Sequence, residues 1–250
     1  MKTIELAAYL DDLLNIRNIK DESLNGLQVM NSGNVHTIAF AVDASLEAYK
    51  EAAAAGAEML LVHHGQFWGR ETAVTGSYYH RLKALIDADL ALYAAHLPLD
   101  MHPDLGNNIQ AAKKMKWPCP EPFGTYHDAI IGIRIRFERA VGIRSFIRSL
   151  ESGLQCHVEP WLFGKKNIKH LIYVSGGGLS LLDQAIEADA DVFVTGEPKH
   201  SYYWTAKEAN INVLFAGHYA TETLGIRAVA ANVEKQLKLK TVMLDLPTGL

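Results

Sequence analysis

The sequence contains few cysteines, no long apolar run and no excess of basic residues. Its two cysteines, Cys119 and Cys156, lack the spacing of a metal or redox motif and fit a reducing compartment. No segment is apolar over enough residues to span a bilayer, and the N-terminus shows no signal-peptide pattern. The formal net charge of −4 gives no global basic footprint for nucleic acid. We therefore expect a soluble cytoplasmic protein with no membrane association and no indicated nucleic-acid partner.

Short apolar runs alternate with amphipathic stretches along most of the 250-residue chain, which is 49% hydrophobic. Such runs are typical of buried strands, and their alternation with helices predicts an α/β protein with mostly parallel sheets. The expected strands are residues 37–42, 60–62, 90–95, 169–174, 191–194, 211–216 and 241–245. The expected helices are residues 3–15, 46–55, 77–88, 142–152 and 179–188, followed by a helix that carries Ile226, Val229, Val233 and Leu237 on one face.

The two halves of the chain resemble each other. A shift of 132 positions places Val42 on Val174 and Val62 on Val194, each at the end of an expected strand. We predict an internal duplication of a βαβαβ unit. The alternative is a chance similarity, because α/β units often share this pattern.

A second match supports the duplication. The third expected strand of each half is followed by histidine, three further residues and a carboxylate, as His96-x3-Asp100 and His218-x3-Glu222. The shift between these two segments is ten residues smaller than 132. A shorter loop before the third strand of the second half would account for the difference. We therefore predict two similar α/β lobes, residues 1–116 and 169–250. Residues 117–168 would form a short linking module with a proline-rich start and an edge strand near 129–137.

Five candidate metal ligands lie at or just beyond the ends of expected strands: His63, His64, Asp100, His218 and Glu222. In open α/β sheets, ligands bind where strands end, so lobes that face one cleft would bring the five together. Imidazole and carboxylate donors favour Zn, Mn or Fe over Ca or Mg. Five ligands exceed the needs of one tetrahedral zinc, so the set predicts two divalent metal ions that activate water.

Other residues beside this cluster are candidates for different roles. Glu197 and His200 occupy the position that His63 and His64 hold in the first half, and both are candidate proton carriers. The alternative for Glu197 is to cap the following helix. His96 is a proton carrier, a sixth metal ligand, a group that supports a ligand, or a structural residue.

Two features near the cluster have a candidate role in binding substrate. The glycine run 176–178 opens a helix whose free N–H groups would bind an anion such as a phosphate, although tight turns also require glycine. Phe67 and Trp68 are candidates for the floor of a base-binding pocket, with a core role as the alternative.

Several motifs together make the chain similar to the NIF-three-like family, and most of all to its bacterial YbgI-type members. They are Asn25-Gly26-Leu27-Gln28-Val29, Leu61-Val62-His63-His64-Gly65, His96-Leu97-Pro98-Leu99-Asp100, Gly106-Asn107-Asn108, Thr195-Gly196-Glu197 and Gly217-His218-Tyr219-Ala220-Thr221-Glu222. The resemblance implies the NIF-three-like fold, two α/β lobes with a dinuclear metal site between them. It implies the same five ligands, with Glu222 as the bridge, and a ring-shaped homohexamer built as a trimer of dimers.

The resemblance also bears on activity. Members of this family are commonly labelled GTP cyclohydrolase 1 type 2 homologues, although no motif here specifies GTP. The leading hypothesis is a metal-dependent hydrolase that acts on a nucleotide or related small molecule. The alternative is a non-catalytic, metal-binding, ring-shaped scaffold for a protein or nucleic-acid partner. Redox chemistry at an iron pair is a third possibility.

Overall fold

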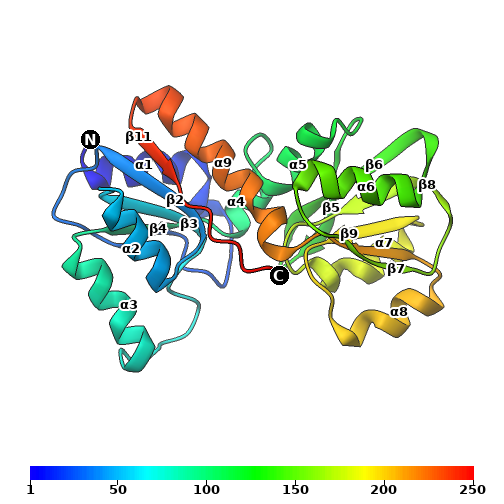
Figure 1. Ribbon diagram of the computed structural model, residues 1–250, viewed down its shortest axis with the longest axis horizontal. Coiled ribbons are helices and arrows are strands. Elements are labelled where there is room, and N and C mark those ends of the chain that lie inside the picture. The colour runs from blue at the N-terminus through cyan, green and yellow to red at the C-terminus, as the bar shows by residue number, and fades with distance from the viewer. The chain divides into compact units, whose positions relative to one another are not determined.

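The computed structural model describes all 250 residues and divides into two compact units, each built around one sheet (Figure 1). Unit 1 comprises Met1–Leu99 and Ile226–Leu246, and unit 2 comprises Asp100–Gly225 and Pro247–Leu250. None of the helices combines the length and apolarity needed to cross a bilayer.

The sheet of unit 1 has the strand order β1-β4-β3-β2-β11. Its strands are β1 (Gly26–Val29), β2 (Thr37–Asp43), β3 (Met59–His64), β4 (Ala91–Ala94) and β11 (Lys240–Met243). All neighbours pair in parallel except β1, which runs antiparallel to β4 at the edge. β2 and β3 are apolar along nearly their whole length because helices cover both faces of the sheet.

Two pairs of helices cover this sheet. Helices α2 (Leu46–Ala54) and α3 (Gly76–Asp87) pack on one face, where Ala48 and Leu85 join a core with alternate strand residues. Helices α1 (Thr3–Leu13) and α9 (His218–Leu237) are linked to each other by a hydrogen bond from the Tyr9 hydroxyl to Asn232. The Tyr93 hydroxyl of β4 donates to Asp11 of α1. Two short helices remain in this part of the chain: η1 (Ile16–Asn18), which follows α1, and α4 (Leu97–Met101), which leads into unit 2.

The sheet of unit 2 has the order β5-β6-β8-β9-β10-β7, with β8, β9 and β10 parallel and the other pairings antiparallel. The strands are β5 (Glu121–Tyr126), β6 (Ala129–Gly142), β7 (Glu159–Leu162), β8 (Asn167–Tyr173), β9 (Val192–Thr195) and β10 (Asn212–Phe215). Helices α5 (Asn107–Met115) and α6 (Ile143–Leu154) pack on one face. The other face is covered by η2 (Gly178–Leu181), α7 (Leu182–Glu187) and α8 (Tyr203–Glu208), with η3 (His200–Tyr202) leading into α8.

The strand pairing agrees with the predicted duplication over its first two strands. Ala41 lies opposite Val62 in unit 1, and Tyr173 lies opposite Val194 in unit 2. Each of these residues is 132 positions from its counterpart. On the third strand the pairing differs, because Val62 lies opposite Ala94 whereas Val194 lies opposite Leu214. His96 therefore follows its paired residue, Ala94, by two positions, whereas His218 follows Leu214 by four.

The predicted division at residues 117 and 169 does not coincide with the two units. Residues 117–168 supply β5, β6, α6 and β7 to the same sheet as β8, β9 and β10, so they form no separate module. β5 and β7 each contain a proline and lie at the two edges of the sheet, where the missing N–H breaks no ladder. At the other end, β11 pairs with β2 and returns the chain to unit 1.

Candidate metal centre

In unit 1, three histidines gather at the carboxyl ends of β3 and β4. His63 and His64 are the last two residues of β3, and His96 follows β4 by two positions. Their ring centroids lie 4.7 Å (His63–His64), 5.2 Å (His63–His96) and 5.6 Å (His64–His96) apart. One ligand atom from each of the three lies within 4.8 Å of the others, so the cluster has the dimensions of a metal site.

Each of these imidazoles is held through Nδ1 by an oxygen that can only accept. His63 Nδ1 lies 2.9 Å from the Ala95 carbonyl oxygen, and His64 Nδ1 lies 2.8 Å from Asp43 Oδ1. His96 Nδ1 lies 3.0 Å from both carboxylate oxygens of Asp21. Nδ1 therefore carries the proton and Nε2 carries the lone pair, which is the tautomer that ligates a metal.

The Asp21 carboxylate supports His96 by accepting a hydrogen bond from its Nδ1. Its side chain is 3% exposed. Burial by itself would raise the pKa of Asp21, but the hydrogen bond and charge of His96, together with hydrogen bonds from Asn25 and Ser23, lower it to about 2. Asp21 is therefore ionised at neutral pH and accepts from His96.

The motif at residues 25–29 positions the loop around these histidines. Asn25 Oδ1 accepts from the His96 backbone N–H at 2.8 Å, and Gln28 Oε1 accepts from the Gln66 N–H at 2.7 Å. A Cβ on Gly65 would lie 2.6 Å from the Ala94 Cβ, so only glycine fits directly after the histidine pair. Trp68, predicted with a core role as one alternative, is 37% exposed, and its ring centroid lies 5.1 Å from that of His96.

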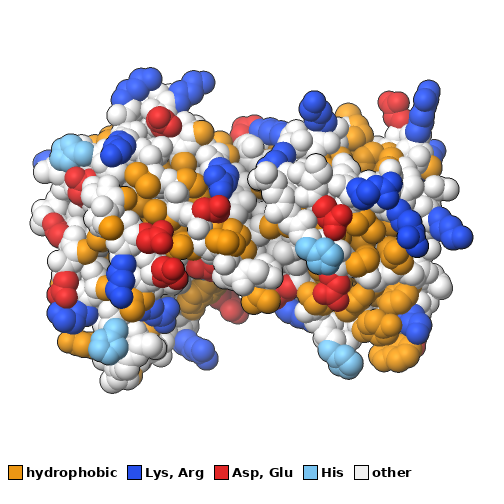
Figure 2. Space-filling view, viewed as in Figure 1, with side chains coloured by type: hydrophobic (Ala, Val, Ile, Leu, Met, Phe, Trp, Pro, Cys, Tyr) orange, Lys and Arg blue, Asp and Glu red, His pale blue; other side chains and the backbone are white.

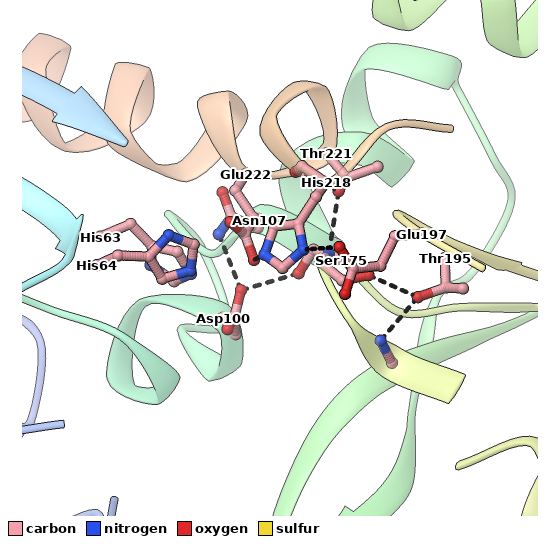
Figure 3. Close-up of polar contacts among 12 residues, drawn as sticks. His63, His64, Asp100, Asn107, Ser175, Thr195, Glu197, His218, Thr221 and Glu222 are labelled. Carbon is pink, nitrogen blue, oxygen red and sulfur yellow. Dashed lines mark hydrogen bonds and ion pairs between the residues drawn. The ribbon is translucent and has the colours of Figure 1, made fainter. Parts of the chain in front are cut away.

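In unit 2, His218 and Glu222 lie one turn apart at the start of α9, and Glu222 Oε1 is 3.2 Å from His218 Nε2 (Figure 3). His218 Nδ1 lies 3.0 Å from Glu197 Oε2. Burial lowers the pKa of His218, but its contacts with Glu222 and Glu197 outweigh burial and raise the pKa to about 9. A protonated imidazole thus bridges two carboxylates here, in a place where a divalent cation would satisfy the same groups.

Asp100 of α4 is held by two neighbours from other elements of unit 2. Asn107 Nδ2 and Ser175 Oγ each donate to Asp100 Oδ1 at 2.8 Å (Figure 3). The Asn107 side chain is fully buried, and its Oδ1 accepts from the Gly225 N–H of α9. Asn108 fixes the same region by accepting from the Ser175 N–H. These hydrogen bonds fix the positions of the Asp100 carboxylate oxygens before any ligand binds.

Two of the three N–H groups in the glycine run 176–178 already donate hydrogen bonds within the protein. The Gly176 N–H donates to Thr221 Oγ1 at 3.0 Å, and the Gly178 N–H donates to Thr195 Oγ1 at 2.9 Å. Gly176 is needed for a different reason: its φ is +60°, and a Cβ there would collide with the Glu222 carboxylate. The run is therefore a tight turn that makes room for Glu222.

The candidate proton carriers differ in placement. Glu197 holds His218 through Nδ1, so its position is that of a group that orients a ligand. His200 lies on η3 and is exposed, and its side chain makes no hydrogen bond or ion pair in the structure. A role for either in proton transfer stays a prediction.

Sequence reasoning missed the groups that orient the ligands: Asp21, Asn25, Gln28, Asp43, Asn107, Ser175 and Thr221. Of these, only the motifs 25–29, 106–108 and 217–222 contain a signal, and that signal came from the family resemblance. The observed donors, imidazole nitrogens and carboxylate oxygens, fit a divalent transition metal.

Comparisons with known proteins identify the family of the chain. The model of the family Duf34/NIF3 (NGG1p interacting factor 3) matches residues 1–248. A Deinococcus radiodurans protein named "GTP cyclohydrolase 1 type 2 homolog" is 41% identical over 98% of this chain and 94% of its own. A Pyrococcus horikoshii protein of the same name is 42% identical over 98% of both chains.

Solved structures show the same fold. The protein TTHA1606 from Thermus thermophilus has a TM-score of 0.92 at 38% identity, over the full length of both chains. A structure described as "protein ybgI, unknown function" has a TM-score of 0.92 at 32% identity, also over both full chains. On the extent of the family match and of these similarities, the chain belongs to the Duf34/NIF3 family.

Proposed function

We propose that the chain is a hydrolase that uses two divalent metal ions and acts on a nucleotide or a related small molecule. The proposed ligands are His63, His64, Asp100, His218 and Glu222, with Glu222 shared between the ions. A bound metal pair of this kind lowers the pKa of coordinated water and stabilises the attacking and leaving oxygens.

The observation that carries this proposal is that hydrogen bonds from other groups fix the side chains that would bind the metal. His63, His64 and His218 are each held through Nδ1, and Asp100 is held through Oδ1. Ligands fixed in this way by carbonyls, carboxylates and amides are typical of metal sites, because the supporting groups set the tautomer and the orientation.

A cavity in unit 2 supports a small-molecule substrate. It has a volume of about 200 Å³, and its wall includes Asp100 together with apolar residues such as Pro122 and Ile131. This volume holds one ring or a similar part of a small molecule. On the face shown in Figure 2, basic and acidic side chains are both present over each unit.

The name of the relatives, "GTP cyclohydrolase 1 type 2 homolog", suggests a purine nucleotide as the substrate class and hydrolytic ring opening as the reaction. In such a reaction the residues of this chain would orient the ligands, hold the substrate in the cavity beside Asp100 and accept a proton from the attacking water at an anchored carboxylate. Glu197 is the carboxylate best placed to do so beside His218.

A substrate panel tests the proposal. Purified wild-type protein, its chelator-treated form and the Glu222→Gln variant are incubated with purine nucleotides and other small phosphorylated compounds. We expect hydrolysis that chelator abolishes, that added metal restores and that Glu222→Gln reduces by roughly a hundredfold or more. Full activity in the variant would contradict the proposal. A metal-loaded protein that hydrolyses none of the panel would favour a non-catalytic binding role.

A further inference from the structure

Trp68 is a large aromatic side chain that lies partly in solvent beside the histidines of unit 1. It is 37% exposed, and its ring centroid lies 5.1 Å from that of His96 and 6.2 Å from that of His64. We infer that the substrate stacks a planar heteroaromatic ring, such as the base of a nucleotide, on the indole of Trp68. This inference rests on the proposed function and adds the part of the substrate that the protein recognises. It holds whichever part of the substrate enters the cavity beside Asp100.

The orientation of the indole leaves its aromatic surface available. Its Nε1–H donates to the Gly65 carbonyl oxygen at 3.0 Å, so the one polar group of the ring is already satisfied within the protein. The planes of Trp68 and His96 are inclined at 72°, so these two rings meet edge to face and do not stack. The indole can therefore interact with a ligand through its π surface, which suits another planar ring.

The backbone of Trp68 is held by the segment that precedes β1. Ser23 pairs with Trp68 in an isolated antiparallel bridge, and the Leu24 N–H donates to the Phe67 carbonyl oxygen at 3.0 Å. A side chain that is already fixed at its backbone and at its ring nitrogen loses little conformational entropy when a ligand stacks on it. This preorganisation favours binding.

The neighbouring Phe67 does not offer the same surface. It is half-buried, and its ring meets that of Tyr78 on α3 edge to face, with the centroids 6.2 Å apart. Both Phe67 and Trp68 were predicted as candidates for the floor of a base-binding pocket, with a core role as the alternative. Phe67 has the packing role, and Trp68 is the residue with exposed ring surface beside the candidate metal centre.

Stacking defines a class of ligand. Every base has a π face, so an aromatic side chain selects a planar ring over a sugar or a phosphate without choosing among the bases. Removing such a side chain weakens binding by about 5- to 150-fold for each stacked base. We therefore expect Trp68 to contribute affinity for the base and none for the rest of a nucleotide.

Ligand titration of the full chain tests the inference. Wild type, Trp68→Phe, Trp68→Leu and Trp204→Leu are titrated with guanosine monophosphate, adenosine monophosphate and ribose 5-phosphate, each protein in its metal-free and Zn²⁺-loaded forms. Calorimetry gives the Kd, and quenching of tryptophan emission reports a base stacked on an indole. Ribose 5-phosphate is the matched ligand, because it lacks the base. Trp204→Leu is the matched variant, because Trp204 is 57% exposed but lies on α8 of unit 2.

We expect both nucleotides to bind wild type at least about fivefold more tightly than ribose 5-phosphate and to quench its emission. Trp68→Leu should lose this preference and most of the quenching, Trp68→Phe should keep part of both, and Trp204→Leu should retain both. Circular dichroism and metal content should match wild type in every variant.

Three results would overturn the inference. They are a wild type that shows no preference for the ligands with a base, a Trp68→Leu variant that keeps the preference, and a Trp68→Leu variant that loses bound metal. The last result would mean that Trp68 supports the histidines and not the substrate. None of these results contradicts the proposed hydrolase, because the hydrolase is tested by chelation and through Glu222 with substrates of several classes.

Discussion

Gly176 and Glu222 show how closely the backbone approaches the candidate metal centre. Gly176 adopts a φ of +60°, a left-handed conformation that residues with a Cβ rarely adopt, and a Cβ there would collide with the Glu222 carboxylate. Thr221 holds the same turn by accepting from the Gly176 N–H. The position of the carboxylate therefore depends on the absence of a side chain in a distant segment of the sequence.

Gly176→Ala should consequently lose metal as well as stability. We expect the bound metal per chain to fall by about twofold or more and the free energy of unfolding to fall by about 1–3 kcal/mol. Elemental analysis and urea unfolding measure the two effects. Gly56→Ala is the control: Gly56 has a φ of +70° with no atom within 4 Å of its Cβ position, so it reports backbone strain alone. Equal metal content in both variants would contradict the role of Gly176.

Asn107 supports a second prediction at this scale. Its side chain donates to Asp100 and accepts from Gly225, and it is fully buried. Asn107→Ala should destabilise unit 2 by about 2–3 kcal/mol, because two buried hydrogen bonds are lost, one of them to a charged group. It should also lower metal content. Lys114→Ala, an exposed change on the same helix, is the control. Wild-type stability in Asn107→Ala would show that water replaces these bonds.

The chemically distinctive residues could be predicted from the sequence, and the groups that hold them could not. His63, His64 and His218 stand out because paired or regularly spaced histidines at strand ends are uncommon. Asn107 and Ser175 have residue types that occur throughout any chain. Their roles arise only where separate segments meet at Asp100.

At the scale of elements, the parallel centres of both sheets follow from the apolar runs. The shift of 132 positions holds for β2 and β3 against β8 and β9, because these strands are buried on both faces and their register is set by packing. The edge strands β1, β5 and β7 were not predicted as strands. β1 is short and β5 and β7 each contain proline, and β1 and β7 pair with strands far away in the sequence.

The start of β9 carries a prediction about pH. Asp191 is 8% exposed and accepts from the Lys169 and His170 N–H groups of β8 and from Lys165 Nζ. Burial raises its pKa, but these hydrogen bonds outweigh burial and lower the pKa below its ordinary value of 3.8. A carboxylate with a lowered pKa adds stability above about pH 4, and this stability is lost as the pH falls through the folded-state pKa.

Asp191→Asn should therefore cost about 2 kcal/mol at neutral pH, and the difference from wild type should shrink as the pH falls below about 4. Urea unfolding at about pH 7, 5 and 3 measures it, with the exposed change Glu187→Gln as the control. A destabilisation that is equal at neutral and acidic pH would mean that packing, not charge, stabilises the two strands.

At the scale of the whole molecule, each unit contains its own sheet, its own core and its own group of candidate ligands. The chain leaves unit 1 after Leu99, builds unit 2 and returns through α9 to finish unit 1 with β11. Such a path could not be predicted from local patterns, because β11 is assigned to its sheet only by pairing with β2, near the other end of the sequence.

The oligomeric state is a further expectation at this scale. From the family resemblance we expect a homohexamer, arranged as a trimer of dimers. Light scattering of the metal-loaded protein, coupled to size-exclusion chromatography, should give the mass of six chains at micromolar concentration. A mass of one or two chains over the whole concentration range would contradict this expectation.

The metal content of the full chain tests the central claim most directly. Untagged wild type, purified without chelator, is compared by elemental analysis with a His63→Ala/Glu222→Gln variant prepared in parallel. The variant removes one proposed ligand from each unit, and circular dichroism establishes that it is folded. We predict close to two divalent transition-metal ions per wild-type chain and far fewer in the variant. Little metal in both proteins, even after incubation with Zn²⁺, Mn²⁺ or Fe²⁺, would contradict the account.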